Sequence, residues 1–268
     1  MSMLLDKKRV ERFRRLHQGP EVLVLPGVWD VVSARLFAAE GFPALGTTSA
    51  GVCWSVGRGN GWRAFLEASG RIARAVDVPV SFDIENGFDQ RPEVVRQRVR
   101  EAIEAGACGI NLEDGFVDGA LADSAILEDK IRAIRDLCEE MSYPLYVNAR
   151  TDVFLGGPAD LSEAVRRGRL YAAVGADSIF VPGLVDATAI QTFVSEVPAP
   201  VNIYALPMVP PVTQLAALGV RRLSVGCGPM QSLLAHAQRI ARALRDEGNY
   251  TSFVDDWMPY EAAEAICA

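Results

Sequence analysis

The stretch Val78-Pro-Val-Ser-Phe-Asp-Ile-Glu-Asn-Gly87 decides both the fold and the chemistry that we expect. Apolar residues alternate with small or polar ones up to Phe82, as in a β-strand, and an Asn-Gly turn closes the stretch. Asp83 and Glu85 lie two residues apart at this strand end, so their carboxylates point to the same side. Such a pair suits Mg²⁺ or Mn²⁺, and the open alternative is a solvated turn with two surface acids.

Composition narrows the class of protein. The chain has 268 residues, half of them hydrophobic, and a net charge of −7. It can therefore build a sizeable core, and α/β barrels reach this length as one domain. The acidic balance argues against nucleic-acid binding, and we find neither a secretory signal nor a membrane-spanning run. Five Cys without a C-x-x-C spacing predict reduced thiols and a cytoplasmic protein.

Short apolar runs recur eight times, mostly with a helical pattern between them. They are Val22–Leu25, Ala44–Thr47, Val78–Phe82, Gly109–Leu112, Leu145–Asn148, Ser178–Val181, Val201–Tyr204 and Arg222–Val225. Gly106, Gly175 and Gly219 stand where three of the intervening helices should end. Eight such units predict a (β/α)₈ TIM barrel. A doubly wound sheet is the competitor, but the chain lacks a G-x-G-x-x-G after its first strand and a Walker A motif.

We expect one barrel domain over 1–268, because no linker divides the chain. It begins with an N-terminal helix at 5–18, on whose charged surface His17 should be solvated. It ends with a helical tail at 246–268. The tail carries Tyr250, Phe253, Trp257 and Tyr260. Aromatic side chains need burial, so the tail should pack on the barrel or on a neighbouring subunit.

The carboxyl ends of barrel strands collect functional side chains, and here they carry acids and an arginine. Asp83, Glu85 and Glu113 could share one cation, and Arg150 could bind a substrate carboxylate through its planar fork. Thr48, Ser49 and Ala50 could offer backbone N–H groups to an anion. Trp29 and Asn202 are further candidates for substrate contact. Purely structural roles stay open: Glu113 as a cap, Arg150 paired with Glu113 or Asp152, residues 47–51 as a tight turn, and Trp29 as packing.

Several ordered motifs resemble the isocitrate lyase/phosphoenolpyruvate mutase superfamily. They are Thr-Thr-Ser-Ala-Gly-Val (47–52), Pro-Val-Ser-Phe-Asp-Ile-Glu-Asn-Gly (79–87), Gly-Ile-Asn-Leu-Glu-Asp-Gly (109–115) and Asn-Ala-Arg-Thr-Asp (148–152). Residues 176–183, 200–203 and 216–224 extend the likeness over nearly the whole barrel. The resemblance implies Mg²⁺ and a 2-oxo acid or enolate at the barrel mouth. It also implies a homodimer or homotetramer that exchanges C-terminal helices between subunits.

The same resemblance implies a role for each candidate. Asp83 would be the direct metal ligand, and Glu85 and Glu113 would hold metal-bound waters. Arg150 would pair with the substrate carboxylate, and the turn of Thr48, Ser49 and Ala50 would bind the substrate's carboxylate and oxo oxygens.

Two departures from the family pattern matter. Asn60 stands where the family carries an outer-shell Asp, which removes a charge but keeps a hydrogen-bond acceptor for a metal-bound water. The lid segment, 116–128, lacks the Lys-Lys-Cys-Gly-His of isocitrate and methylisocitrate lyases, so the general acid is not identified.

We therefore expect a Mg²⁺-dependent carbon–carbon lyase or hydrolase that acts on a small 2-oxo or 2-hydroxy dicarboxylic acid through an enolate. One alternative is a P–C bond enzyme of the phosphoenolpyruvate mutase or phosphonopyruvate hydrolase type, with Arg58 and Arg63 near the phosphonate. The other is a protein that binds a 2-oxo acid without converting it.

Overall fold

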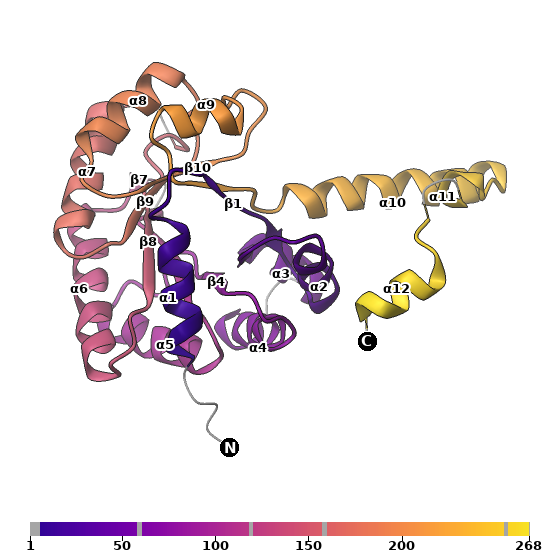
Figure 1. Ribbon diagram of the computed structural model, residues 1–268, viewed down its shortest axis with the longest axis horizontal. Coiled ribbons are helices and arrows are strands. Elements are labelled where there is room, and N and C mark those ends of the chain that lie inside the picture. The colour runs from indigo at the N-terminus through magenta and orange to yellow at the C-terminus, as the bar shows by residue number, and fades with distance from the viewer. Residues whose placement is uncertain (1–5, 58–60, 118–119, 157–159, 255–256, 268) are drawn as a thin grey trace.

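The structure is a computed structural model that describes residues 6–57, 61–117, 120–156, 160–254 and 257–267. Within these ranges nine parallel strands curl into a nearly closed barrel, with helices packed around it (Figure 1). The strands are β1 Leu23–Leu25, β2 Gly27–Val28, β3 Leu45–Thr47, β4 Val80–Asp83, β5 Gly109–Glu113, β8 Tyr146–Arg150, β9 Ser178–Val181, β10 Val201–Tyr204 and β11 Arg222–Ser224. Each of the eight predicted runs overlaps a strand, and the predicted barrel is confirmed.

The ninth strand, β2, directly follows the first predicted run, Val22–Leu25. Pro26 separates β1 from β2 and has no backbone N–H to give to the sheet. β1 pairs with β11, and β2 pairs with β3, so the two ends of the sheet are consecutive in the chain. The backbone is tight at this point: a Cβ on Gly27 would lie 1.9 Å from the carbonyl oxygen of Gly226. Only glycine fits there.

Helices follow the strands as the apolar spacing predicts. They are α1 Lys7–Leu16, α2 Val31–Ala39, α3 Ser49–Val56, α4 Gly61–Arg74, α5 Pro92–Glu104, α6 Ser124–Glu140, α7 Leu161–Ala173, α8 Ala187–Glu196, α9 Val212–Ala217, α10 Gly228–Glu247, α11 Thr251–Val254 and α12 Tyr260–Cys267. Gly106, Gly175 and Gly219 follow α5, α7 and α9 with φ of 107°, 106° and 88°, which is why glycine ends these helices.

The predicted lid segment divides into two parts. β6 Phe116–Val117 and β7 Ala120–Leu121 form a short antiparallel pair after β5. Asp123 then caps α6 by accepting a hydrogen bond from the Ala125 N–H at 3.0 Å. The second half of the segment is therefore the start of a long helix rather than a loop.

Helix α1 packs against the N-terminal ends of β5 and β8. Val10 and Phe13 are fully buried, and the Phe13 ring lies edge-on to Tyr146, with 5.4 Å between ring centroids. The expectation that His17 is solvated is wrong. Its side chain is buried, stacks on Tyr146 at 4.1 Å, and places Nδ1 2.9 Å from the Phe13 carbonyl oxygen. Burial, helped by Arg222 and Arg14, lowers the pKa of His17 to about 3.

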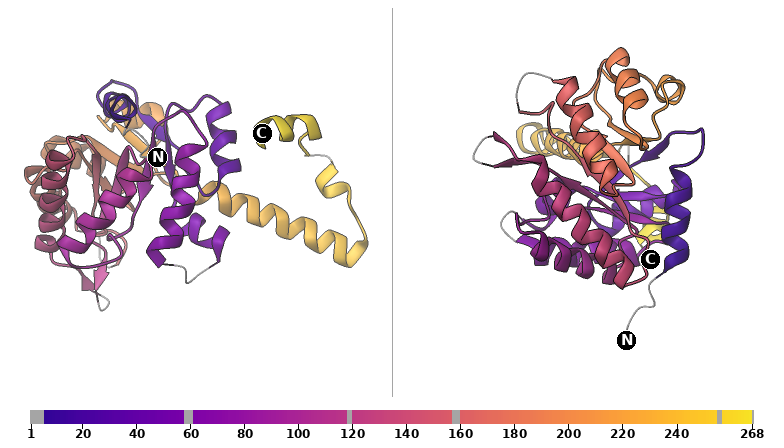
Figure 2. Two further views of the ribbon diagram at one scale, coloured as in Figure 1. Left: turned by 90° about the horizontal axis from the view of Figure 1, so that it is seen from below. Right: turned by 90° about the vertical axis from the view of Figure 1, so that its left-hand side faces the viewer.

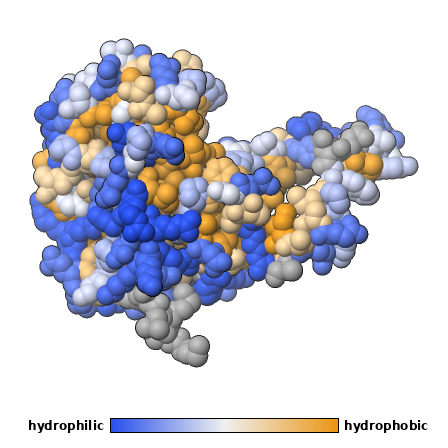
Figure 3. Space-filling model, in the orientation of Figure 1, coloured by the Kyte–Doolittle hydropathy of each residue, from blue (hydrophilic) through white to orange (hydrophobic). Residues whose placement is uncertain are grey.

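The C-terminal helices form an arm that projects from the barrel (Figures 1 and 2). Helix α10 points away from the sheet, and α12 returns to contact α2, where the Arg35 guanidinium donates to the Cys267 carbonyl. Figure 3 shows apolar side chains on this arm. Tyr250, Trp257 and Tyr260 are 62%, 64% and 74% exposed, so the barrel of the same chain does not bury them. The tail thus packs on the barrel only through α12 and α2, and packing on a neighbouring subunit stays a prediction.

None of the helices in the described ranges combines the length and the apolar character that crossing a membrane requires.

Candidate active site

A cavity of about 300 Å³ opens at the carboxyl ends of the barrel strands. The lining draws on strand ends from around the barrel, together with the loops that follow them. Its polar residues are Thr47, Thr48, Ser49, Asp83, Asn111, Arg150, Tyr204, Arg222, Ser224 and Cys227, and apolar side chains such as Leu25, Leu155, Phe180 and Leu206 complete the wall. The volume suits a small acid. Three charged residues line the cavity: Asp83, Arg150 and Arg222.

Asp83 is held at the N-terminus of α3. The backbone N–H and the hydroxyl of Ser49 both donate to its Oδ2, at 3.2 and 2.9 Å. The Asp83 N–H in turn donates to Thr47 Oγ1 at 3.0 Å. The positive end of a helix stabilises a carboxylate in this position. The Ser49 N–H that we expected to bind a substrate anion is therefore already engaged by Asp83.

The other oxygen of this carboxylate, Asp83 Oδ1, is buried and has no hydrogen-bond partner among the described residues. An orphaned carboxylate oxygen beside a polar cavity suits a ligand that supplies positive charge. In the described ranges, no group of three His, Cys, Asp or Glu side chains is arranged to coordinate one metal ion. The donor set therefore fits a hard cation bound directly by Asp83, with other acids acting through water.

Glu113 is the most perturbed acid beside Arg150. Arg150 Nη1 lies 2.9 Å from Glu113 Oε2, and its Nε donates to Asp152 Oδ1 at 2.6 Å. Burial raises the pKa of Glu113 to about 8, with Asp152, Asp83 and Glu85 adding to the rise against the pull of Arg150. The 2.9 Å contact holds for either form of the carboxyl, because a neutral carboxyl oxygen also accepts from a guanidinium.

Burial also raises the pKa of Glu85, with Asp83 next in effect. Glu85 has a φ of 52°, in the left-handed region that a turn directly after a strand requires. Neither Glu85 nor Glu113 belongs to the residues that line the cavity, so both lie behind its wall. This placement agrees with acids that act on a bound ion through water, which stays a prediction.

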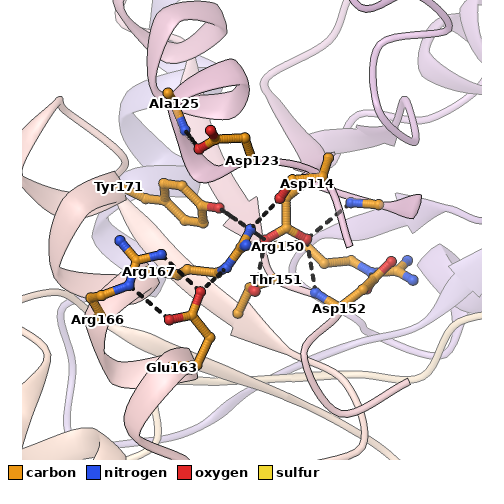
Figure 4. A network of polar contacts seen from close by, with 12 residues as sticks. Asp114, Asp123, Ala125, Arg150, Thr151, Asp152, Glu163, Arg166, Arg167 and Tyr171 are labelled. Carbon is orange, nitrogen blue, oxygen red and sulfur yellow. Dashed lines mark hydrogen bonds and ion pairs between the residues drawn. The ribbon is translucent and has the colours of Figure 1, made fainter. Parts of the chain in front are cut away.

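Behind Arg150 lies a buried network centred on Asp114 (Figure 4). Asp114 Oδ2 accepts from Thr151 Oγ1 at 2.7 Å and from Arg167 Nη1 and Tyr171 OH at 2.9 Å each. Its Oδ1 accepts from two backbone N–H groups, those of Gly115 and Asp152, at 2.9 Å. One carboxylate thus ties together the residues after β5, the residues after β8, and α7, and so fixes the position of Asp152 beside Arg150.

A polar layer crosses the barrel at the floor of the cavity, and three of its members, Asn111, Arg222 and Ser224, line the cavity. Asn111 Oδ1 accepts from Asn148 Nδ2 at 2.8 Å and from Arg222 Nη2 at 3.1 Å. Ser224 Oγ accepts from Asn202 Nδ2 and from Arg222 Nε, both at 3.0 Å. Asn202 is fully buried and its Oδ1 has no partner among the described residues. This candidate therefore belongs to the polar layer but is not among the residues that line the cavity.

The remaining candidates differ in whether they line the cavity. Thr48, Ser49 and Ala50 line the cavity, but Trp29 does not. Trp29 is buried next to Gly51, where a Cβ would come within 3.0 Å of its Cβ, so packing explains it. Asn60 and Arg58 lie outside the described residues.

Sequence reasoning missed two charged residues of the site. Asp152 was considered only as a possible structural partner of Arg150, although it holds the Arg150 guanidinium as closely as Glu113 does. Arg222 was counted as part of an apolar run. The signal was present, because Arg222 and Ser224 are polar residues spaced two apart in a barrel strand, which places both on one face.

Comparisons with known proteins agree with this geometry. The family model described as phosphoenolpyruvate phosphomutase matches residues 13–245. An uncharacterized protein of Mycobacterium tuberculosis (strain ATCC 25618 / H37Rv) is 37% identical over 238 residues, which cover 87% of this chain and 89% of the relative. A 2-methylisocitrate lyase of Halalkalibacterium halodurans is 28% identical over 270 residues, covering 94% of this chain and 87% of that enzyme.

Among solved structures, a candidate lyase/mutase of Burkholderia cenocepacia J2315 is 34% identical, with a TM-score of 0.92 over 98% of this chain and 97% of that chain. Named relatives are lyases and mutases that act on small acids, so the prediction of an enzyme is supported. The chain belongs to the phosphoenolpyruvate phosphomutase family, within the isocitrate lyase/phosphoenolpyruvate mutase superfamily that its motifs resemble.

Proposed function

We propose that this enzyme is a Mg²⁺-dependent lyase or hydrolase that cleaves a carbon–carbon bond in a small 2-oxo or 2-hydroxy dicarboxylic acid through an enolate. One observation carries the proposal: Asp83, whose Oδ1 has no hydrogen-bond partner among the described residues, and Arg150 line the same cavity of about 300 Å³. The cavity thus offers a carboxylate that can bind a cation and a guanidinium that can bind the carboxylate of a small acid. The 2-methylisocitrate lyase among the relatives supports this type of reaction.

Asp83 would hold the ion directly, and Glu85 and Glu113 would accept hydrogen bonds from its waters. When bound, Mg²⁺ supplies Lewis-acid polarisation of an oxo group. Mn²⁺ suits the same oxygen donors.

Residues of the chain would bind the substrate and transfer the proton. Arg150 holds Glu113 through Nη1 and Asp152 through Nε, which leaves Nη2 as the donor for a substrate carboxylate. Glu113, with a pKa of about 8, is protonated at neutral pH and lies next to Arg150, from where it would exchange a proton with the reacting acid through a water molecule. Thr48 and Ala50 would contact the substrate's oxygens from the cavity wall. Substrate contacts by Trp29 and Asn202 stay predictions without support from the cavity lining.

The test is turnover. The protein is incubated with Mg²⁺ and a panel that includes oxaloacetate and methylisocitrate, and pyruvate and the other cleavage products are measured. We expect turnover of at least one acid, its loss in Arg150→Gln, and its retention in Arg166→Gln, a variant of an exposed arginine on α7 that pairs with Glu163. No turnover on any panel member would refute the proposal.

A P–C bond enzyme is the second candidate, and the matching family model, described as phosphoenolpyruvate phosphomutase, favours it. Of the two arginines expected near a phosphonate, Arg63 is exposed on α4. Phosphorus NMR on phosphonopyruvate and phosphoenolpyruvate decides this alternative, because an unchanged spectrum after long incubation removes it. A non-catalytic binding protein is not favoured, since the named relatives are enzymes.

The exposed aromatic residues of the C-terminal arm support the predicted homodimer or homotetramer with exchanged helices. The cytoplasmic location stays a prediction from the composition.

A further inference from the structure

Arg222 differs from the other buried arginines of the barrel. It is 1% exposed, yet its hydrogen-bond partners, Ser224 and Asn111, are neutral. Its Nη1 is buried and has no hydrogen-bond partner within the described ranges. By contrast, Arg150 pairs with two acids, and so does Arg167. No described carboxylate lies within ion-pair distance of Arg222.

A buried charge without a counter-charge is costly to the fold, since desolvation is not repaid by an ion pair. Two hydrogen bonds to a hydroxyl and an amide oxygen do not require that charge, because a neutral amide side chain could donate to the same groups. Burial lowers the pKa of Arg222 to about 10, against smaller opposing effects of Tyr146 and Asp83, so the guanidinium remains charged at neutral pH. The protein therefore keeps a positive charge here for which its own described side chains provide no ion-pair partner.

The position of this charge relates it to the cavity. Arg222 is the first residue of β11, and its side chain contributes to the cavity lining together with Asn111 and Ser224. Gly226 and Cys227, which follow the end of the same strand, line the cavity nearer its mouth. Arg222 therefore makes the deep end of the cavity cationic. The charge of Arg150 is already paired with Asp152, whose Oδ1 lies 2.6 Å from Arg150 Nε.

We propose that Arg222 is a substrate-binding residue that holds the negative charge of a small, planar 2-oxo carboxylate or its enolate at the deep end of the cavity. This assignment rests on the proposed function only in taking the ligand to be a small acid, and it does not depend on which bond is broken. Arg222 then selects anions over neutral analogues of the same size.

The experiment measures binding of oxalate, a stable planar dianion, by calorimetry in a Mg²⁺ buffer. We expect Arg222→Met to weaken oxalate binding by about tenfold or more, the usual value of a hydrogen bond from a charged group. We expect Arg222→Lys, which keeps the charge, to weaken it by less than about threefold. The control is Arg221→Met, which changes the adjacent arginine outside the cavity lining and should leave oxalate binding unchanged.

Thermal unfolding of the same variants separates binding from structure. A purely structural Arg222 predicts that Arg222→Met unfolds at lower temperature and binds oxalate as the parent does. Our assignment predicts weaker binding with unchanged or higher thermal stability, because an unpaired buried charge is removed. It is overturned if Arg222→Met binds oxalate within about threefold of the parent, or if the parent binds no oxalate.

If Arg222→Met does not fold, the variant Asn111→Asp tests the same role of Arg222. The new carboxylate would stand where Asn111 Oδ1 now lies 3.1 Å from Arg222 Nη2, and would neutralise the guanidinium in place. We expect higher thermal stability together with weaker oxalate binding, whereas unchanged binding overturns the assignment. A protein that binds oxalate through Arg222 but turns over no acid would refute the proposed function and leave this assignment intact.

Discussion

Replacing Asp114 by Asn should destabilise the fold strongly, because this buried carboxylate accepts five hydrogen bonds. Its side chain is 0% exposed, and the paired Arg167 side chain is 7% exposed. Asparagine keeps the shape but turns one acceptor into a donor and removes the counter-charge. Removing one partner of a buried ion pair costs about 3–5 kcal/mol. The lower end applies here, since Arg167 Nε keeps Glu163 Oε1 at 2.7 Å.

Thermal unfolding measures this effect. In a protein of this size each kcal/mol moves the midpoint by about 2–4 °C, so we expect Tm to fall by roughly 10 °C. The matched control is Asp129→Asn, which breaks an exposed pair with Arg132 and should change stability by less than about 1 kcal/mol. If Asp114→Asn unfolds within about 1 kcal/mol of the parent, the carboxylate does not hold the strand ends together and the reasoning fails.

Three further predictions concern the metal and pH. Asp83→Ala should abolish Mg²⁺ binding in calorimetry, because a ligand and its charge are lost together; binding equal to the parent would place the metal elsewhere. The pKa of Glu113 rises from 4.5 to about 8 on folding, so its neutral form adds stability below pH 4.5 that is lost as pH rises toward 8. Glu113→Gln should therefore flatten stability across this window, and an unaltered pH profile would contradict the assignment. The pKa of His17 falls from 6.5 to about 3, so its neutral form adds stability above pH 6.5 that is lost as pH falls toward 3. In urea unfolding, His17→Gln should therefore lose less stability than the parent as pH falls from 6.5 toward 3. An equal loss of stability in both proteins would count against burial of His17 as its cause.

Much of the fold could be predicted because it depends on local patterns. The apolar runs each overlap a strand, and positive-φ glycines such as Gly106 ended helices where predicted. Strand ends also pointed to Asp83, because functional side chains of a barrel gather at that edge. These features need only the sequence within about ten residues of each element.

The remainder depends on which distant residues meet inside the barrel. His17 looked solvated on a charged helix, yet it stacks on Tyr146, more than a hundred residues away in the chain. Arg222 looked like the edge of an apolar strand until the strand order placed it across the barrel from Asn111. No local pattern reports such a pairing, because it is set by strand register and barrel closure.

The pairing of β1 with β11 has a consequence for the order of folding. β1 begins at Leu23 but pairs with β11 at Arg222–Ser224, so the last seam of the sheet joins segments nearly two hundred residues apart. During synthesis the barrel cannot close until β11 has left the ribosome, and until then β1 and β10 each present an unpaired edge. Such long-range pairing is slow to form. The nascent chain therefore stays prone to aggregation until synthesis has passed β11.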